Sequence, residues 1–110
     1  MCGIAGIYSL NGKTIPDLKL RLNKMIKLIN YRGPDNSGIY VNNKQTFGMC
    51  NNQLSIVSPK KKIKLPLTYN NNTFLSFNGE IYNYLYLKKN IKFQIRILNI
   101  LQILKYFIIF

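Results

Sequence analysis

The chain has 110 residues, the size of one domain, and 16 lysines and arginines against three acidic residues give it a formal net charge of +13. A domain this short buries roughly two-thirds of its unfolded surface, so its core must be compact. Two cysteines, Cys2 and Cys50, are too few for a disulfide framework, and the start lacks the charged-then-apolar pattern of a secretory signal, so we expect a reduced, cytoplasmic protein.

The basic residues are spread along the chain from Lys13 to Lys105, and only residues 60–64 (KKKIK) form a cluster. A short run of this kind usually lies in a solvated loop. No group of aromatic and basic residues typical of a nucleic-acid site accompanies it, so we expect neither a nucleic-acid nor an anionic-membrane partner.

The first predicted elements are a strand and a helix. Residues 3–9 (GIAGIYS) are apolar and β-prone, and the NGK after them is typical of a turn. At the start of the helix predicted over residues 15–30, Pro16 suits the first helical position and Asp17 suits the positive end of the helix. Apolar residues then recur at helical spacing, which predicts one face packed on a sheet: Leu18, Leu22, Met25, Ile26 and Ile29.

Residues 31–38 (YRGPDNSG) break the helical pattern with two glycines and a proline and are predicted to form a loop. Short strands are predicted next at residues 39–41, 46–50 and 54–57. Beyond the lysine cluster, the β-prone residues 73–77 and 80–84 lie on either side of Asn78 and Gly79. An Asn-Gly pair between such segments is a strong signal for a β-hairpin.

Residues 93–110 differ from the rest of the chain. They are dominated by Ile, Leu and Phe, have Arg96 and Lys105 as their only charges, and contain no glycine or proline. A segment of about 18 residues is near the lower limit for a membrane span, and the interspersed polar residues argue against one.

Cys2 directly follows the initiator methionine. If Met1 is removed, Cys2 becomes the N-terminal residue, and its thiol then lies next to a free α-amine. Because a free thiol ordinarily has a pKa near ~8.5 and an α-amine one near ~8, such a residue combines a nucleophile and a base without a histidine, and this chain has no histidine. The alternative for an isolated cysteine is a small buried hydrophobe.

Four segments carry a family resemblance: MCGIAGIYS at residues 1–9, YRGPD at 31–35, LSIV at 54–57 and SFNGEIYNY at 76–84. In this order and approximate spacing they resemble the glutaminase domain of class II (N-terminal nucleophile) glutamine amidotransferases, in particular that of glutamine-hydrolysing asparagine synthetase. The resemblance covers residues 1–93 and stops about halfway through that domain. It implies an α+β fold, the incomplete N-terminal half of an Ntn-hydrolase-type α/β/β/α sandwich, followed by a hydrophobic tail at residues 94–110.

The resemblance also implies a role for each matching residue. Cys2 attacks the side-chain amide carbon of L-glutamine, a thioester forms as ammonia leaves, and water then releases glutamate. The Asn78 side-chain amide and the Gly79 backbone N–H donate to the oxyanion, each contributing about 3–4 kcal/mol, and Glu80 faces the substrate's amino group. A tight turn alone is the alternative for Asn78 and Gly79. The other motifs supply a substrate-binding segment, Gln53, Leu54, Ser55, Ile56 and Val57, and a loop that orders the site, Arg32, Gly33, Pro34 and Asp35.

The chain departs from the family pattern at four places. The family has an arginine immediately before LSIV, whose guanidinium holds the glutamine α-carboxylate, and this chain has Gln53. A charge-assisted bond is worth about 1.5–3 kcal/mol, so we expect glutamine affinity to be lower by about tenfold to a hundredfold. Tyr31 and Asn51 stand where the family commonly has histidine. The family's Ser-Asp-Thr-Glu motif, whose aspartate binds the substrate's α-amino group, does not follow Phe93.

The string QIRILN after Phe93 is compatible with a frameshift. Codons can be chosen for it that encode Asn-Ser-Asp-Thr-Glu in another reading frame, so we expect residues 94–110 to be an out-of-frame tail. The alternative that stays open is an amphipathic helix with Ile97, Leu101, Leu104 and Ile108 on one face. The nucleotide sequence beyond codon 93 distinguishes the two.

Three functions stay open from the sequence. The first is a glutaminase of weak or no activity whose partners are L-glutamine and a separate synthetase chain. The second is a non-catalytic gene remnant. The third, which rests on net charge alone and which the spread of the basic residues disfavours, is a basic protein that binds nucleic acid or a membrane surface. The sequence lacks a Ser-Gly-Gly-x-Asp-Ser loop for ATP. We therefore expect no cofactor and no metal in this chain, with ATP and magnesium belonging only to the family's synthetase domain.

Overall fold

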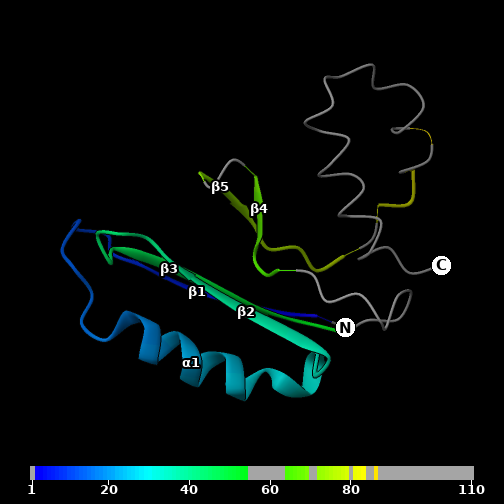
Figure 1. Cartoon of the computed structure of the whole chain (residues 1–110), viewed down its shortest axis with the longest axis horizontal. Helices are drawn as coiled ribbons and strands as arrows, with labels where there is room; N and C mark the ends of the chain where they lie inside the picture. Colours follow the sequence, from blue (N-terminus) through cyan, green and yellow to red (C-terminus); the bar gives the residue numbers. More distant parts are fainter. Residues whose placement is uncertain (1, 55–63, 70–71, 80, 84–85, 87–110) are drawn as a thin grey trace.

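The computed structural model describes residues 2–54, 64–69, 72–79, 81–83 and 86. Helix α1 (Leu18–Leu28) covers one face of a three-stranded antiparallel sheet. The hairpin of β4 (Leu67–Tyr69) and β5 (Thr73–Leu75) lies over the opposite face, which gives three layers (Figure 1). One helix combined with antiparallel sheets confirms the α+β class.

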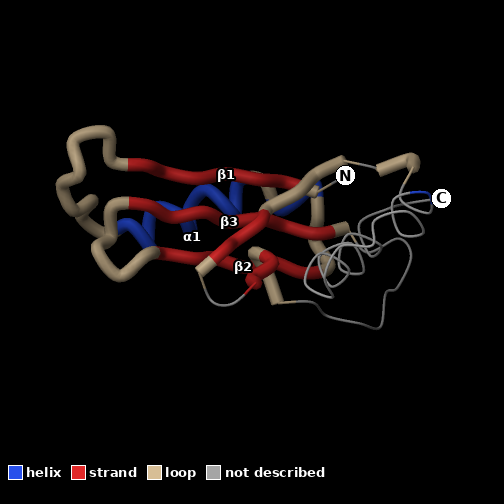
Figure 2. Tube along the Cα trace, turned by 90° about the horizontal axis from the view of Figure 1, so that it is seen from above, coloured by secondary structure: helices blue, strands red, loops and turns tan. Residues whose placement is uncertain are grey.

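The three-stranded sheet has β3 at its centre, between β1 and β2 (Figure 2). Its strands are β1 (Gly3–Tyr8), β2 (Asn36–Val41) and β3 (Phe47–Gln53). The register places Gly3 opposite Asn52 on one side of β3 and Asn36 opposite Gln53 on the other. The strand predicted at residues 3–9 is confirmed.

Strands β2 and β3 are longer than predicted. Residues 36–38 belong to β2 and residues 51–53 belong to β3, although these are mainly amide, serine and glycine positions. The loop predicted over residues 31–38 therefore ends at Asp35, and its start overlaps a 3-10 helix, η1 (Asn30–Arg32). The prediction failed because pairing with a neighbouring strand overrides the low β propensity of such residues.

Helix α1 presents the predicted apolar face to the sheet. Leu18, Leu22 and Ile26 are buried, and Met25 and Ile29 are partly buried. The polar positions between them face solvent, as the 3.6-residue period requires. The face predicted from the spacing of apolar residues is confirmed.

The predicted start of α1 is wrong. The helix begins at Leu18, and Asp17 precedes it with φ 53° and ψ 32°, in the left-handed region. Asp17 is the N-cap, its carbonyl accepting the first helical bond from the Arg21 N–H at 2.9 Å, and Pro16 lies outside the helix. Aspartate tolerates this backbone conformation better than most residues, which is why the chain turns here and not at the proline.

The core between α1 and the sheet centres on Cys50 of β3, which is fully buried against the helix, with Ala5 and Ile7 of β1 packed beside it. Gly48 permits this close packing, because a Cβ at that position would lie 2.5 Å from the Leu22 Cδ1 atom. The helix therefore sits directly on the middle strand.

The second layer corrects another prediction. Strand β5 pairs with β4, with Tyr69 opposite Thr73, so residues 70–72 connect the hairpin. The hairpin predicted around Asn78 and Gly79 is not observed: residues 81–83 are not in a strand, and Gly79 does not have the left-handed φ that an Asn-Gly hairpin turn requires. Among the residues that the structure describes, this Asn-Gly pair does not form a tight hairpin turn.

Residues 60–63 of the lysine cluster and the tail at residues 94–110 lie outside the described residues. In the part of the chain that the structure describes, no helix has both the length and the apolar character needed to cross a membrane.

Candidate functional site

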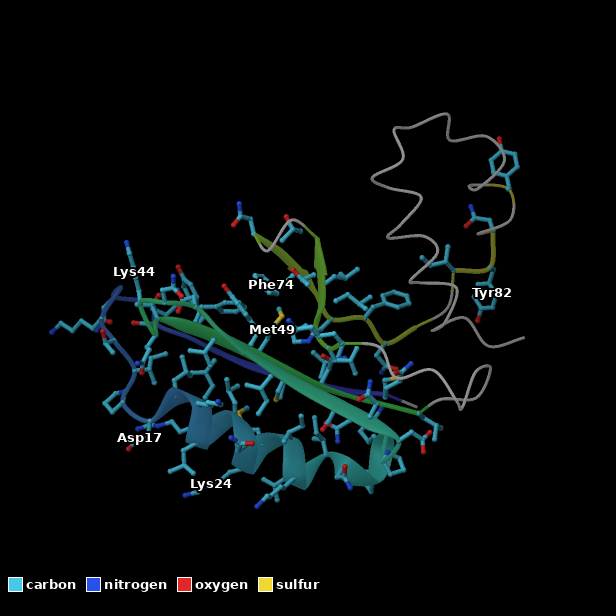
Figure 3. The ribbon with its side chains drawn as sticks, in the orientation of Figure 1. Asp17, Lys24, Lys44, Met49, Phe74 and Tyr82 are labelled. Carbon is cyan, nitrogen blue, oxygen red and sulfur yellow. The ribbon has the colours of Figure 1, made fainter. Side chains whose placement is uncertain are left out.

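The face of the sheet opposite α1 carries the candidate site. Side chains alternate along each strand, so Cys50 and Asn52 face the helix while Met49, Asn51 and Gln53 face the β4–β5 hairpin. The hydroxyl of Ser76, just after β5, donates to Asn51 Oδ1 at 3.4 Å and lies 3.6 Å from the Met49 sulfur. Figure 3 shows Met49 between the sheet and the hairpin. The site therefore lies between two layers, where water is partly excluded.

Cys2 enters this space just before β1. It is half-buried and packs against the buried cluster of Leu65 and Leu67, together with Leu75 and Phe77. A thiol placed this way is partly sheltered from water yet still exposed enough to meet a ligand.

The segment that carries Asn78 and Gly79 is attached to the same cluster. Phe77 immediately precedes Asn78, and its ring lies 3.2 Å from the position of a Cβ at Gly79. Both Asn78 and Gly79 are exposed. The structure therefore brings the Asn-Gly segment and Cys2 to one apolar cluster, and it shows no direct contact between them among the described residues.

Arg32 reaches the site from η1. Its Nε donates to the backbone carbonyl of Cys2 at 3.2 Å, thirty positions away in the sequence. A guanidinium bond to a carbonyl restrains the backbone that carries the thiol. This contact places the YRGPD loop directly beside Cys2.

Gln53 follows Asn52, the last residue of β3 that pairs with β1, and Cys2 precedes Gly3, the partner of Asn52. Continuing the register beyond Gly3 and Asn52 places Cys2 across from Gln53, and Gln53 is only 2% exposed. Its Oε1 accepts a hydrogen bond from Asn36 Nδ2 at 3.3 Å. The position at which the resemblance leads us to expect an arginine is a buried, neutral amide pair in this chain.

The remainder of the YRGPD loop packs on the backbone of Gln53. Pro34 forms a parallel bridge with Gln53, and the Asp35 N–H donates to the Gln53 carbonyl at 3.1 Å. Gly33 is buried, and a Cβ there would lie 2.7 Å from the backbone N and C atoms of Gln53. Only glycine fits this approach without a shift of the loop.

Replacing Gly33 with alanine is therefore expected to lower the free energy of unfolding by about 1–3 kcal/mol, because the added methyl group meets backbone atoms that cannot rotate away. Urea unfolding monitored by circular dichroism measures this. The matched control is Ser37→Ala at an exposed position of β2, expected to change stability by about 0.5 kcal/mol or less. Equal midpoints for the two variants would show that the loop does not depend on this contact.

Sequence reasoning did not identify the buried amides of β3 as structural residues. Asn51 and Asn52 are 0% exposed. The Asn52 Nδ2 group donates to the Ile26 carbonyl at 3.3 Å and to Asn30 Oδ1 at 3.2 Å, which ties the end of α1 to the sheet. A run of three amides directly after an apolar strand was the available signal, since buried amides persist only where they are hydrogen-bonded.

The two thiols have different environments. Burial raises the pKa of the Cys50 thiol, and a hydrogen bond involving the backbone of Ala5 opposes this with a smaller effect. Cys50 therefore stays protonated near neutral pH and is a poor nucleophile. Within the described residues, no group of His, Cys, Asp or Glu side chains could hold a metal ion.

Several predicted site residues have no described structure. Leu54 is half-buried just after β3, whereas Ser55, Ile56, Val57 and Glu80 lie outside the described residues. Their roles, like those of the residues placed above, stay predictions.

Comparison with known proteins identifies the family. A model of the glutamine amidotransferase domain matches residues 1–98. The chain belongs to this family. It is 34% identical, over 86% of its length, to a Methanocaldococcus jannaschii protein whose name assigns it to the glutamine-hydrolyzing asparagine synthetases.

Two further relatives of this amidotransferase domain are bacterial. The chain is 32% identical over 84% of its length to asparagine synthetase [glutamine-hydrolyzing] 1 of Bacillus subtilis, and 30% identical over 76% to asparagine synthetase B [glutamine-hydrolyzing] of Escherichia coli. It spans 21% of the M. jannaschii protein, 14% of the B. subtilis protein and 15% of the E. coli protein. The chain is thus a glutamine amidotransferase domain similar to the glutaminase region of asparagine synthetases. No solved structure matches it.

Proposed function

We propose that this domain hydrolyses L-glutamine to glutamate and ammonia with Cys2 as the nucleophile, on the N-terminal nucleophile fold of class II amidotransferases. The observation that carries the proposal is the position of Cys2, half-buried on the cluster that also anchors the Asn78 segment and bonded through its carbonyl to Arg32. The matched relatives are named as glutamine-hydrolyzing, which supports glutamine as the substrate.

The proposed reaction begins after removal of Met1. The Cys2 thiol loses its proton to its own α-amine and attacks the side-chain amide carbon of glutamine. The Asn78 amide and the Gly79 N–H donate to the oxyanion, which can contribute about 3–4 kcal/mol per donor. Return of the proton to the leaving nitrogen releases ammonia and leaves a thioester on Cys2. Water then attacks the thioester carbonyl, and glutamate leaves as the thiol is restored.

Substrate affinity in this proposal is limited at Gln53. A neutral amide engaged with Asn36 offers no charge to the α-carboxylate of glutamine. In addition, the Ser-Asp-Thr-Glu motif expected to bind the α-amino group is absent from the sequence. We therefore propose weak glutamine binding by these 110 residues.

The Gln53→Arg variant tests this reading. A guanidinium that forms two parallel bonds with the carboxylate is worth about 1.5–3 kcal/mol, so we expect kcat/KM for glutamine to rise by about tenfold to a hundredfold. Glutamate release, followed with a coupled dehydrogenase, measures it. Gln53→Lys adds a positive charge but cannot form two parallel hydrogen bonds with the carboxylate, so we expect a smaller rise in kcat/KM.

Gln45→Arg is the matched control, because it adds the same charge in the connection between β2 and β3, at the opposite end of these strands from Gln53. We expect no change in kcat/KM for this variant. Equal gains from both arginine variants would mean that net charge, and not a carboxylate contact, is responsible. No hydrolysis in any variant would favour the second candidate, a non-catalytic remnant, for which the buried neutral pair at Gln53 is the supporting observation.

Ammonia made by this domain needs an acceptor. We propose that a synthetase chain, which in the family is the part that uses ATP and magnesium, consumes it. The domain boundary at residue 93 and the out-of-frame origin of residues 94–110 stay predictions, tested by the nucleotide sequence.

A further inference from the structure

A pocket of about 410 Å³ lies at the outer edge of β2; Cys2 does not line it, although Leu65 borders both the pocket and the cluster on which Cys2 packs. It is bounded by β2, by the β4–β5 hairpin and by Lys19 near the start of α1. None of the residues proposed for glutamine hydrolysis lines it. Its volume falls within the range of about 300–1,000 Å³ typical of small-molecule sites.

The wall of this pocket is apolar and includes a pair of stacked aromatic rings. The rings of Tyr40 and Phe74 stack with centroids 3.5 Å apart and planes inclined by 21°, joining β2 to β5. Pro66 is buried next to them. Figure 3 shows Phe74 on the hairpin, over the sheet. Such a surface suits an aromatic ring or a short apolar chain.

The rim of the pocket carries two cations. Lys19 from α1 and Lys64 from the segment before β4 both line it and are exposed. Within the described residues, neither ammonium group has an ion pair, and the whole chain contains only three acids, Asp17, Asp35 and Glu80. Two uncompensated cations beside a low-dielectric wall raise the local potential and attract an anion.

The edge of β2 adds further donors to the pocket. Thr68 also lines the pocket, but its Oγ1 atom is buried and not open to it. Because the Asn42 N–H donates to Phe47 on β3 at 3.0 Å, the antiparallel alternation turns the N–H groups of Ile39 and Val41 away from β3, toward the open edge. Both of these residues line the pocket.

From these features we infer that the pocket formed by Lys19, Lys64, Thr68 and the Tyr40–Phe74 stack binds a small anion with an apolar body. The negative group, a carboxylate or phosphate, pairs with the two ammonium groups and accepts from the N–H groups of the strand edge. The apolar body packs on the aromatic wall. The ligand is a single small molecule and not a peptide strand, because both lysines and the aromatic stack line one pocket of about 410 Å³.

Phenyl phosphate is the probe for this site, titrated into the full chain by isothermal calorimetry, with inorganic phosphate and phenol as its two halves. We expect phenyl phosphate to bind more tightly than either half by about tenfold or more, since each half forms only part of the contacts. The double variant Lys19→Gln and Lys64→Gln should weaken this binding by about tenfold or more.

The control is the double variant Lys24→Gln and Lys44→Gln, which removes the same charge from exposed positions that do not line the pocket; Figure 3 shows Lys24 on the side of α1 away from the sheet. We expect less than about a twofold change.

Three results would overturn the inference. The first is equal weakening by both lysine pairs, which would indicate general attraction to a basic protein. The second is binding of inorganic phosphate as tight as that of phenyl phosphate, which would mean that the aromatic wall does not contribute to binding. The third is tight binding of an acidic hexapeptide with no binding of phenyl phosphate, which would make the edge of β2 a peptide site.

Discussion

The Cys2→Ala variant is expected to release ammonia from glutamine at no more than the uncatalysed rate. Alanine cannot form a thioester, and the proposed donors at Asn78 and Gly79 then have no tetrahedral intermediate to stabilise. Cys2 is half-buried and precedes β1, so its replacement should leave the three-stranded sheet intact. Ammonia release, together with a far-ultraviolet circular dichroism spectrum, measures both effects.

Cys50→Ala is the matched control for the second thiol. Cys50 is buried against α1 and its raised pKa keeps it protonated, so hydrolysis per folded molecule should be unchanged, even though stability falls. Loss of activity in the folded Cys50→Ala variant, with activity retained in Cys2→Ala, would reverse the assignment of the nucleophile.

The Leu22→Ala variant is expected to lower the free energy of unfolding by about 2–5 kcal/mol. Leu22 is 0% exposed at the centre of the core and packs against Gly48, so its removal leaves a cavity between helix and sheet. Domains of this size are stable by only about 5–15 kcal/mol, so this loss is a large fraction of the total. Urea unfolding measures it.

Leu20→Ala, on the same helix, is the control for Leu22→Ala. Leu20 is 54% exposed, so its truncation leaves no cavity and should cost about 0.5 kcal/mol or less. If the two variants unfold at the same urea concentration, α1 does not pack on the sheet through the face described here.

The sequence predicted those parts of the fold that depend on local pattern. The apolar spacing of α1 identified Leu18, Leu22 and Ile26 as core residues, and the β-prone residues 3–9 identified β1. These succeeded because a helical period and a continuous apolar run are properties of the segment itself.

The errors arose where a distant segment decides the structure. Residues 51–53 are amides, and they are in a strand because β2 pairs with all three and β1 pairs with Asn51 and Asn52. Asn78 and Gly79 have the composition of a hairpin turn, yet β5, the strand before them, pairs with the preceding strand β4. Pairing over long sequence separations cannot be read from local propensity.

In the candidate site, too, residues in local motifs were predicted and contacts that depend on distant pairing were not. Cys2, Arg32 and Gln53 were identified from motifs. The structure joins Arg32 to the Cys2 carbonyl, and Gln53 directly follows the last β3 residue that pairs with β1. The Asn36 partner of Gln53 was not predicted, because its contact depends on the register between β2 and β3.

The central claim is that Cys2, as the N-terminal residue, is the nucleophile of a glutamine site. The most direct measurement is peptide mass mapping of the chain after treatment with a chloromethyl ketone analogue of glutamine. We expect a chain without Met1 that carries one adduct, on Cys2, formed more slowly when L-glutamine is present, and an unmodified Cys50. A retained Met1, equal modification of both thiols, or labelling of Cys2 that L-glutamine does not slow would contradict the claim.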